Sequence, residues 1–289
     1  MSNDIFRIYR PITAAPFKKS GDYCEYPPCD ALKPYIRCFW GTNGELPRDN
    51  FQPEHSIVIP DTCMDIIMDI DNESGKAHEF FCGINDGYFY SRPKPFDEKK
   101  TTFAIRFYCH SVILFAGCDM SEVLNSAAPA EQYFEDFGKA VRREISEAKT
   151  TAERISLAEN YLLRRLNKNR ENPDFMNALY YIISRNGNAD ISDISLYTAL
   201  SKRQLERIFK RITGVSPKNL TALIRYQLLW QDVISDGFDI QEAVLKFGYC
   251  DQSHLLKSFK KFHGETPSKA LRNARKDVAF LQYNSTKMR

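Results

Sequence analysis

The sequence predicts an α+β protein with short strands in its first part and helices in its second. Three observations carry this prediction. At 289 residues the chain is long enough for two separate cores. Alternating apolar runs separated by turn residues dominate up to about residue 115, and a helical period begins after residue 119. A helical segment near residue 200 is then repeated 50 residues later in the sequence.

Composition and charge narrow the choice of partners. Hydrophobic residues make up 43% and charged residues 27%, and every apolar run is far shorter than the roughly 18 residues of a membrane span. The start, MSNDIFRIYR, lacks a signal-peptide pattern, so a cytoplasmic location without a membrane partner is expected. Residues 174–289 carry 18 Lys and Arg against 11 Asp and Glu, and the rest carries 22 against 26. Such a basic end is expected where a protein meets an acidic polymer.

Scattered cysteines and histidines indicate no cofactor or metal. The eight cysteines form no C-x-x-C pair, so reduced thiols are expected. The spacing of Cys24, Cys29 and Cys38 matches no common structural zinc site. His254 and His263 are nine residues apart, and on a helix they face opposite sides and cannot share a metal.

Five short runs predict the strands of a first domain over residues 1–118. The segments between them supply Pro, Gly and Asp where turns need them. Several closely spaced strands indicate a sandwich or a small barrel. The runs are SIVIP (56–60), MDIIMDI (64–70), EFFCGI (79–84), GYFYS (87–91) and TTFAIRF (101–107).

Residues 119–172 are predicted as a helical linker. Helices are expected at 121–125, 131–148 and 151–169. In the last of these, Ile155, Ala158, Leu162 and Leu166 make one apolar stripe. Such a stripe usually packs on the core of its own chain. The alternative is a two-fold contact between helices of two chains, which would make the linker a dimerisation region.

The helical domain, residues 173–275, holds two copies of one unit and is followed by a tail, 276–289. Residues 200–220 align without gaps on residues 250–270, with Gly214 over Gly264. Each copy predicts a helix that starts at an N-cap, Ser201 or Asp251, and ends at that glycine. Shorter helices at 191–198 and 240–247 precede them, which is the helix-turn-helix arrangement.

The spacing of the two units suits DNA. Residues 216–236 predict one helix of about 20 residues, which spans roughly 30 Å, close to the 34 Å of one DNA turn. The outward faces of the two second helices carry Arg, Lys, Gln and Glu, side chains that can bind base edges. A single basic stripe would indicate only a solvated helix face. The same stripe on two capped helices of a repeat favours DNA recognition.

These residues resemble the AraC-type (AraC/XylS) transcription regulators. IQEAVLKFGYCDQSHLLKSFKKFHGETPSKAL (240–271) is similar to the signature region of that family, including G-[FY]-x-D-Q-S-H and G-x-[TS]-P. The sequence departs from it at Ala243-Val244 and at Ala199-Leu200, where the first turn often carries glycine. The resemblance implies base contacts by Arg203, Glu206, Arg207, Gln252, Ser253 and Lys257, and phosphate contacts by Lys202, Lys210, Ser216, Lys260 and Thr266.

The first domain resembles an uncharacterised cupin-like barrel found on some members of that family. LKPYIRCFW (32–40), IPDTCMDIIMDI (59–70) and FAIRFY (103–108) carry this likeness, which implies a role in sensing a small molecule or in dimerisation. Arg106, among apolar neighbours, either points to solvent or is a buried cation awaiting an anionic group. The candidate pocket residues are Trp40, His55, Asp65, Cys82 and Arg106.

We therefore expect a sequence-specific transcription regulator, an activator, that binds double-stranded promoter DNA. RNA polymerase, an unknown small-molecule effector and a second copy of the chain are further candidate partners. No enzyme is predicted, because G-x-S-x-G, P-loop and H-E-x-x-H motifs are missing. Two alternatives stay open: a sensor enzyme with a catalytic barrel and secondary DNA binding, and a co-regulator that binds protein instead of DNA.

Overall fold

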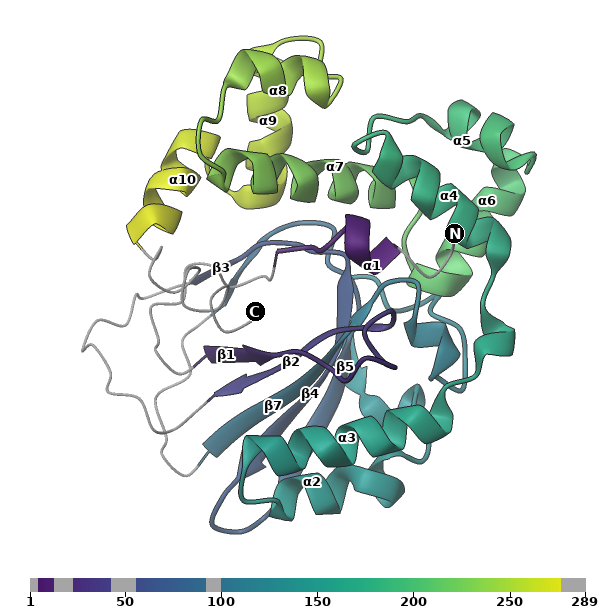
Figure 1. The fold of residues 1–289 in the computed structure, drawn as a ribbon, viewed down its shortest axis with the longest axis vertical. Coiled ribbons are helices and arrows are strands. Elements are labelled where there is room, and N and C mark those ends of the chain that lie inside the picture. Colours follow the sequence, from purple (N-terminus) through teal and green to yellow (C-terminus); the bar gives the residue numbers. More distant parts are fainter. Residues whose placement is uncertain (1–4, 13–22, 43–55, 92–99, 277–289) are drawn as a thin grey trace.

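The computed structural model describes residues 5–12, 23–42, 56–91 and 100–276 (Figure 1). Strands gather in its N-terminal part and helices in its C-terminal part, which confirms the predicted α+β class. In Figure 1 the sheet lies between two helices, α2 and α3, on one side and a long helix, α7, on the other. The strands are β1 (Tyr23–Tyr26), β2 (Ile36–Thr42), β3 (Ser56–Val58), β4 (Cys63–Asp71), β5 (Ala77–Cys82), β6 (Phe89–Ser91), β7 (Lys100–Tyr108) and β8 (Ala127–Pro129).

Six strands form an antiparallel sheet in the order β1-β2-β7-β4-β5-β8, and β3 pairs with β6 in a separate ladder. All five predicted runs are strands. The sheet is amphipathic because side chains alternate across it. One face carries Phe81 and Phe107, whose rings contact Phe134 at centroid distances of 5.6 and 5.9 Å. The other face carries Asp65 and Arg106, which are cross-strand partners of β4 and β7.

The linker differs from its prediction in two places, and in one of them residues 133–136 interrupt the helix expected at 131–148. Residues 121–125 form turns, so the helix expected there is wrong. The local reason is turn chemistry: the Asp119 side chain accepts a bond from Ser121 N, and Asn125 has a left-handed φ of 54°. A π-helical turn, Gly138–Arg142, leads into α2 (Arg143–Glu147), and α3 (Thr151–Arg165) follows.

The apolar stripe of α3 packs on the core of its own chain. Ala158 and Leu162 are completely buried, and Ile155 and Leu166 are partly buried against the same core. Tyr161 of this helix packs edge-on against Phe137 at 5.3 Å. This stripe is therefore not free for a second chain.

Seven helices make up the C-terminal part as far as residue 276, where the described residues end. Figure 1 shows α7 running across the molecule between the sheet and the other helices, with α4 to α6 at one end and α8 and α9 at the other. Their bounds are α4 (Pro173–Ser184), α5 (Ile191–Thr198), α6 (Lys202–Thr213), α7 (Pro217–Ile234), α8 (Ile240–Lys246), α9 (Gln252–His263) and α10 (Pro267–Lys276).

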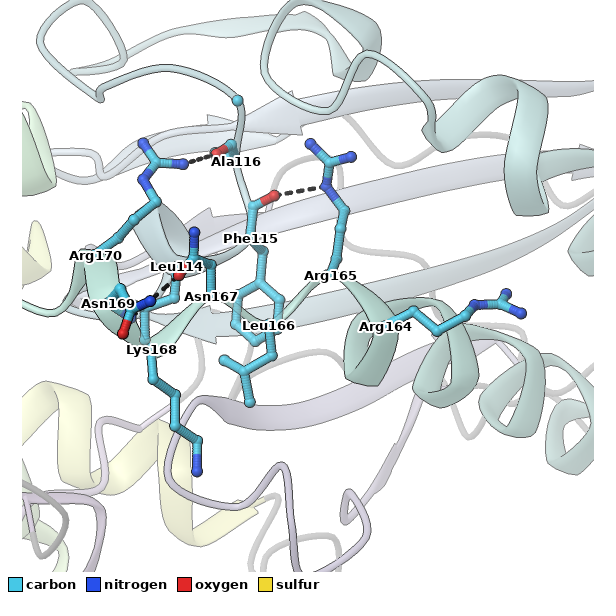
Figure 2. A pocket seen from close by; sticks show the side chains of 11 residues that line it. Leu114, Phe115, Ala116, Arg164, Arg165, Leu166, Asn167, Lys168, Asn169 and Arg170 are labelled. Atoms are coloured by element: carbon cyan, nitrogen blue, oxygen red, sulfur yellow. Dashed lines mark hydrogen bonds between the residues drawn. The ribbon is translucent and has the colours of Figure 1, made fainter.

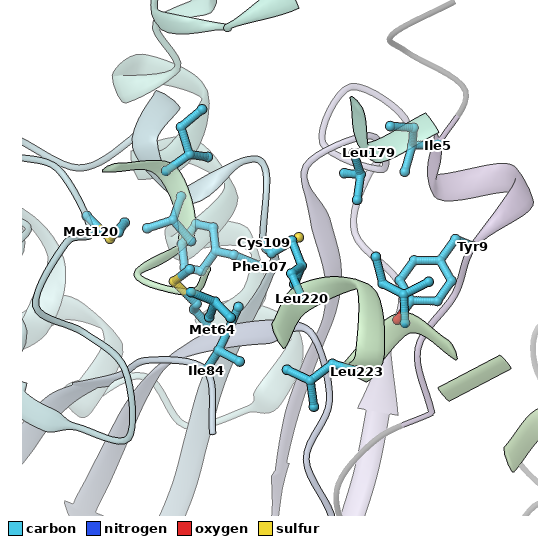
Figure 3. Packing of buried hydrophobic residues seen from close by; sticks show 14 of the residues in the cluster. Ile5, Tyr9, Met64, Ile84, Phe107, Cys109, Met120, Leu179, Leu220 and Leu223 are labelled. Atoms are coloured by element: carbon cyan, nitrogen blue, oxygen red, sulfur yellow. The ribbon is translucent and has the colours of Figure 1, made fainter. Parts of the chain in front are cut away.

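The buried side chains of the two parts form one continuous cluster. Figure 3 shows Leu220 and Leu223 of α7 within it, together with Cys109 and Tyr9 from the N-terminal part. A short helix, α1 (Ile5–Ile8), belongs to the same cluster through Ile5. The helix α7, which connects the two repeated units, is thus also a surface on which the N-terminal part packs.

Candidate nucleic-acid interface

The predicted N-caps and terminal glycines of the two recognition helices, α6 and α9, are confirmed. Ser201 and Gln204 form the predicted capping box at the start of α6, and Asp251 accepts a bond of 2.7 Å from His254 N at the start of α9. Gly214 and Gly264 end these helices with φ of 73° and 79°, a conformation that glycine adopts without strain.

Burial on one side of each helix fixes which side faces outward. Leu205, Phe209, Leu255 and Phe259 are completely buried. A helix repeats every 3.6 residues, so the side chains between these positions point away from the core. Five of the six proposed base-contacting residues are exposed and Gln252 is partly exposed; the exposed ones are Arg203, Glu206, Arg207, Ser253 and Lys257.

The proposed phosphate-contacting residues flank these faces. Lys202, Lys210 and Lys260 are exposed on α6 and α9. Ser216 is partly buried and its hydroxyl already accepts a bond of 3.2 Å from Asn219 N, as the N-cap of α7. Thr266 is exposed directly before Pro267, the first residue of α10. Backbone N–H groups at such helix starts are natural partners for phosphate oxygens.

The first turn accommodates its departure from the family pattern. Ala199 adopts φ 56° at the end of α5, where glycine would be unstrained. In the second unit a glycine does this work, because Gly248 has φ 65°. The Ser195 hydroxyl donates a bond of 2.5 Å to the Leu200 carbonyl and closes the first turn.

The two histidines of the second unit lie in different surroundings. His254 is exposed, whereas His263 is 1% exposed. The Tyr226 hydroxyl of α7 lies 2.8 Å from Nδ1 of His263, and burial lowers the pKa of His263 to about 3. Among the described residues no group of three or more His, Cys, Asp and Glu is placed to hold a metal ion.

Four of the five candidate pocket residues converge on the sheet. Arg106 donates to Asp65 through Nε at 2.8 Å and Nη2 at 3.1 Å, and the Trp40 indole donates to Asp65 at 3.0 Å. Cys82 is the cross-strand partner of Asp65, and burial raises the pKa of this thiol to about 12. His55 lies outside the described residues.

Arg106 is a buried cation, 6% exposed, and not a solvent-facing strand residue. Its bidentate partner is Asp65 of the adjacent strand, an anion that the chain itself supplies. The sequence prediction missed a second pair beside it, Arg37 and Glu25, at 3.5 Å. The signal was present, since Arg37 stands among apolar residues in YIRCF as Arg106 does in FAIRF.

A basic cavity of about 650 Å³ lies between the end of α3 and residues 114–117 (Figure 2). Arg164, Arg165, Lys168 and Arg170 line it. Arg165 and Arg170 donate to the backbone carbonyls of Phe115 and Ala116, so both guanidinium groups are already bound. Figure 2 shows Arg164 and Lys168 pointing elsewhere, and the four cations do not converge on one ligand.

Comparisons with known proteins match both parts of the chain. Residues 194–273 match a helix-turn-helix domain, and residues 24–129 match a domain of unknown function, DUF6597. A search of curated proteins gives no significant match. In the part of the chain that the structure describes, no helix combines the length and apolar character that a bilayer span needs.

Solved structures of ToxT from Vibrio cholerae share similarity with the chain. An apo variant aligns at 12% identity with a TM-score of 0.40, over 78% of this chain and 100% of its own. A form bound to (E)-4-(8-methylnaphthalen-1-yl)but-3-enoic acid aligns at 11% identity with a TM-score of 0.39, over 88% of this chain and 99% of its own.

Two helix-turn-helix units on one connecting helix, each with an exposed polar recognition face, define a DNA-binding class of protein. Within that class, residues 194–273 are an AraC-type helix-turn-helix domain. The chain thus carries an AraC-type helix-turn-helix domain, which indicates a DNA-binding transcription regulator, and a DUF6597 domain over residues 24–129.

Proposed function

We propose that the chain is a cytoplasmic, sequence-specific activator that binds one face of promoter DNA with both helix-turn-helix units. The observation that carries this proposal is the repeated helix-turn-helix unit, in which the capped helices α6 and α9 expose polar and basic faces. The connecting helix α7 has 18 residues and is about 27 Å long, which suits half-sites in successive major grooves.

The proposed contacts divide into two kinds. Arg203, Glu206, Arg207, Gln252, Ser253 and Lys257 read base edges, and Lys202, Lys210, Ser216, Lys260 and Thr266 bind phosphates. Arginine and lysine bind guanine well, glutamine binds adenine, and glutamate accepts from cytosine. The exposure of these side chains, except for the partly buried Gln252 and Ser216, supports this division.

Each predicted domain has its own proposed role. Residues 1–118 sense a small molecule or mediate dimerisation, residues 119–172 link the parts, residues 173–275 bind DNA, and residues 276–289 form a tail. RNA polymerase is the proposed protein partner of an activator. The sheet face around Trp40, Asp65, Cys82 and Arg106 is the proposed sensing region, because it holds charged groups inside the fold.

A binding selection with the full chain tests this function. Random duplexes are enriched on the protein at physiological salt, and the winning sequence is compared with a scrambled duplex. Arg203→Ala and Lys257→Ala are each expected to cost about 1 to 3 kcal/mol of binding and to relax the preferred sequence at one position. Arg143→Ala, an exposed change on α2, is the control and leaves selection intact.

The proposal is wrong if the full chain enriches no sequence over scrambled DNA. If DNA binding is present and both variants leave regulation of a reporter unaltered, a co-regulator that acts through protein contacts replaces the activator.

A further inference from the structure

We propose that the N-terminal part sets the distance between the two recognition helices and so fixes the half-site spacing that the protein accepts. This inference rests on the proposed function. It is carried by contacts at three places: the middle of α7, the end of α6 and the end of α9. We call these contacts the clamp, which consists of Gln227, Gln231, Met120 and Tyr88 with their partners.

The middle of α7 is held through a buried glutamine. Gln227 is completely buried and uses both ends of its amide. Its Oε1 accepts a bond of 2.8 Å from Ile12 N, and its Nε2 donates a bond of 2.7 Å to Pro60 O. One turn later, Gln231 donates a bond of 2.7 Å to Arg10 O. Two separate segments of the N-terminal part therefore fix the position of α7, the covalent bridge between the units.

The ends of the recognition helices are held at equivalent points of the repeat. Met120 N donates a bond of 2.8 Å to Arg211 O in the last turn of α6, and a Cβ on Gly214 would lie 2.6 Å from Met120 O. At the matching glycine of α9, Gly264, a Cβ would lie 3.1 Å from Cε2 of Tyr88. The backbone at Met120, near the start of the linker, thus packs on the C-cap of α6, and the ring of Tyr88 packs on the C-cap of α9.

The clamp does not cover the outward faces of α6 and α9 that carry the proposed base-contacting residues. Arg203, Arg207 and Lys257 are exposed although the N-terminal part is present. The clamp therefore does not mask DNA-binding residues. It acts on geometry, because each unit connects to α7 through a short segment and the N-terminal part restrains α7 and both units together. Because the two units are already held in place before DNA binds, less conformational entropy is lost on binding. DNA whose half-sites have a different spacing is then bound less tightly.

Half-site spacing is the property that such a restraint controls. One inserted base pair moves a half-site by about 3.4 Å and rotates it by about 35° around the DNA axis. A rigid pair of helices loses one half-site on that duplex, whereas a loosely joined pair can follow it. Gln227 is in this sense a positioning residue that touches no DNA.

The test uses the full chain and the duplex selected as described above. A second duplex carries one extra base pair between the half-sites. The measured quantity is the ratio of the two dissociation constants. The wild type is expected to discriminate by about tenfold or more, and Gln227→Leu and Tyr88→Ala are expected to reduce that ratio at least about threefold. Gln132→Leu, an exposed change outside the clamp, leaves the ratio unaltered.

The ratio separates positioning from folding. A variant that merely unfolds weakens binding to both duplexes by the same factor and leaves the ratio unchanged. The inference is overturned if both variants discriminate like the wild type, or if the wild type itself tolerates the inserted base pair. If Gln227→Leu yields no folded protein, Tyr88→Ala decides the outcome alone. A wild type that selects no sequence refutes the proposed function first, and the inference falls with it.

Discussion

Arg106 is held in the sheet by two carboxylates and an indole ring. Asp65 binds it bidentately, Asp61 lies 3.7 Å from its Nη1, and its guanidinium carbon lies 5.5 Å from the centre of the Trp40 ring. Burial raises the pKa of Asp61, and the charge of Arg106 opposes that shift. Groups that are buried together in this way depend on one another, because each would be costly to bury alone.

Arg106→Met is expected to lower the free energy of unfolding by about 3 kcal/mol or more, since it leaves Asp65 buried without its cation. Urea unfolding followed by circular dichroism measures the loss. The matched control is Arg143→Met, which breaks an exposed pair with Glu147 and should leave the midpoint almost unchanged. Equal effects of the two substitutions would contradict this account of the buried pair.

Two buried histidines predict a loss of stability in acid. Burial lowers the pKa of His263 to about 3 and that of His110 to about 4. As the pH falls below about 6.5, the unfolded chain takes up protons at these positions while the folded chain does not. Proton uptake therefore lowers the free energy of the unfolded state relative to that of the folded state. The loss continues until the pH reaches the folded pKa values.

His263 alone is expected to contribute a loss of about 2 kcal/mol between pH 7 and pH 5. Unfolding free energies at these two pH values measure it. His263→Gln should remove this share of the pH dependence, whereas the same substitution at the exposed His254 should preserve it. An unchanged pH profile in His263→Gln would show that the histidine does not stay neutral in the fold.

At the scale of elements, the recognition helices are defined by their ends as much as by their faces. Both end at a glycine with positive φ, and both glycines lie against the N-terminal part. The chain contains a comparison in Gly237, which follows α7 with φ 80° but has no atom of the described residues within 4 Å of the place of a Cβ. Strain and packing at Gly214 can therefore be measured separately.

Gly237→Ala should cost about 1 kcal/mol, which is the penalty of a left-handed alanine. Gly214→Ala carries the same backbone penalty and also places its methyl group against Met120 O, so we expect roughly twice that loss or more. Thermal unfolding of both variants provides the measurement. Similar losses would mean that Met120 moves aside without cost.

The sequence predicted elements well where the signal is local. Alternating runs identified five strands, and N-caps with matching glycines identified the recognition helices. The turns at 121–125 were predicted as a helix, because the apolar spacing there outweighed the turn signals of Asp119 and Asn125. The strands β1, β2 and β8 were not among these runs, and the three residues of β8 carry no alternating pattern.

At the scale of the whole molecule, charge is divided between the two parts. Residues 174–289 carry a net charge of +7, from 18 basic and 11 acidic residues, while the rest carries −4, from 22 and 26. DNA binding then releases counterions from phosphates that the basic part neutralises. The affinity of the full chain should fall steeply with added salt, and the slope should be governed by lysines of the C-terminal part.

Lys260→Ala is expected to reduce the slope of log affinity against log salt by about 1 and to weaken all sequences almost equally. Titrations of the selected duplex and of a scrambled duplex at several salt concentrations measure both effects. Lys33→Ala in the N-terminal part is the control and should not alter the slope. A change in sequence preference in Lys260→Ala would identify this lysine as a base-reading residue instead.

The arrangement of the two parts could not be predicted from local patterns. The sequence identified Arg106 as unusual but not Asp65 as its partner, because pairing across strands depends on register. The partners of Gln227 could not be predicted, since Ile12 and Pro60 stand far away from it in the chain. Polar contacts of this range appear only once the fold is assembled.

The bonds to Gln227 and Gln231 also bear on how the protein is made. Ile12 and Arg10 leave the ribosome before α7, yet they bind Gln227 and Gln231, which stand 215 and 221 positions later in the chain. At about 5 to 20 residues per second, roughly 10 to 40 seconds separate the synthesis of the two sides. During that interval the first residues have no native partner on α7. The N-terminal part therefore reaches its final arrangement only after the DNA-binding part has been translated.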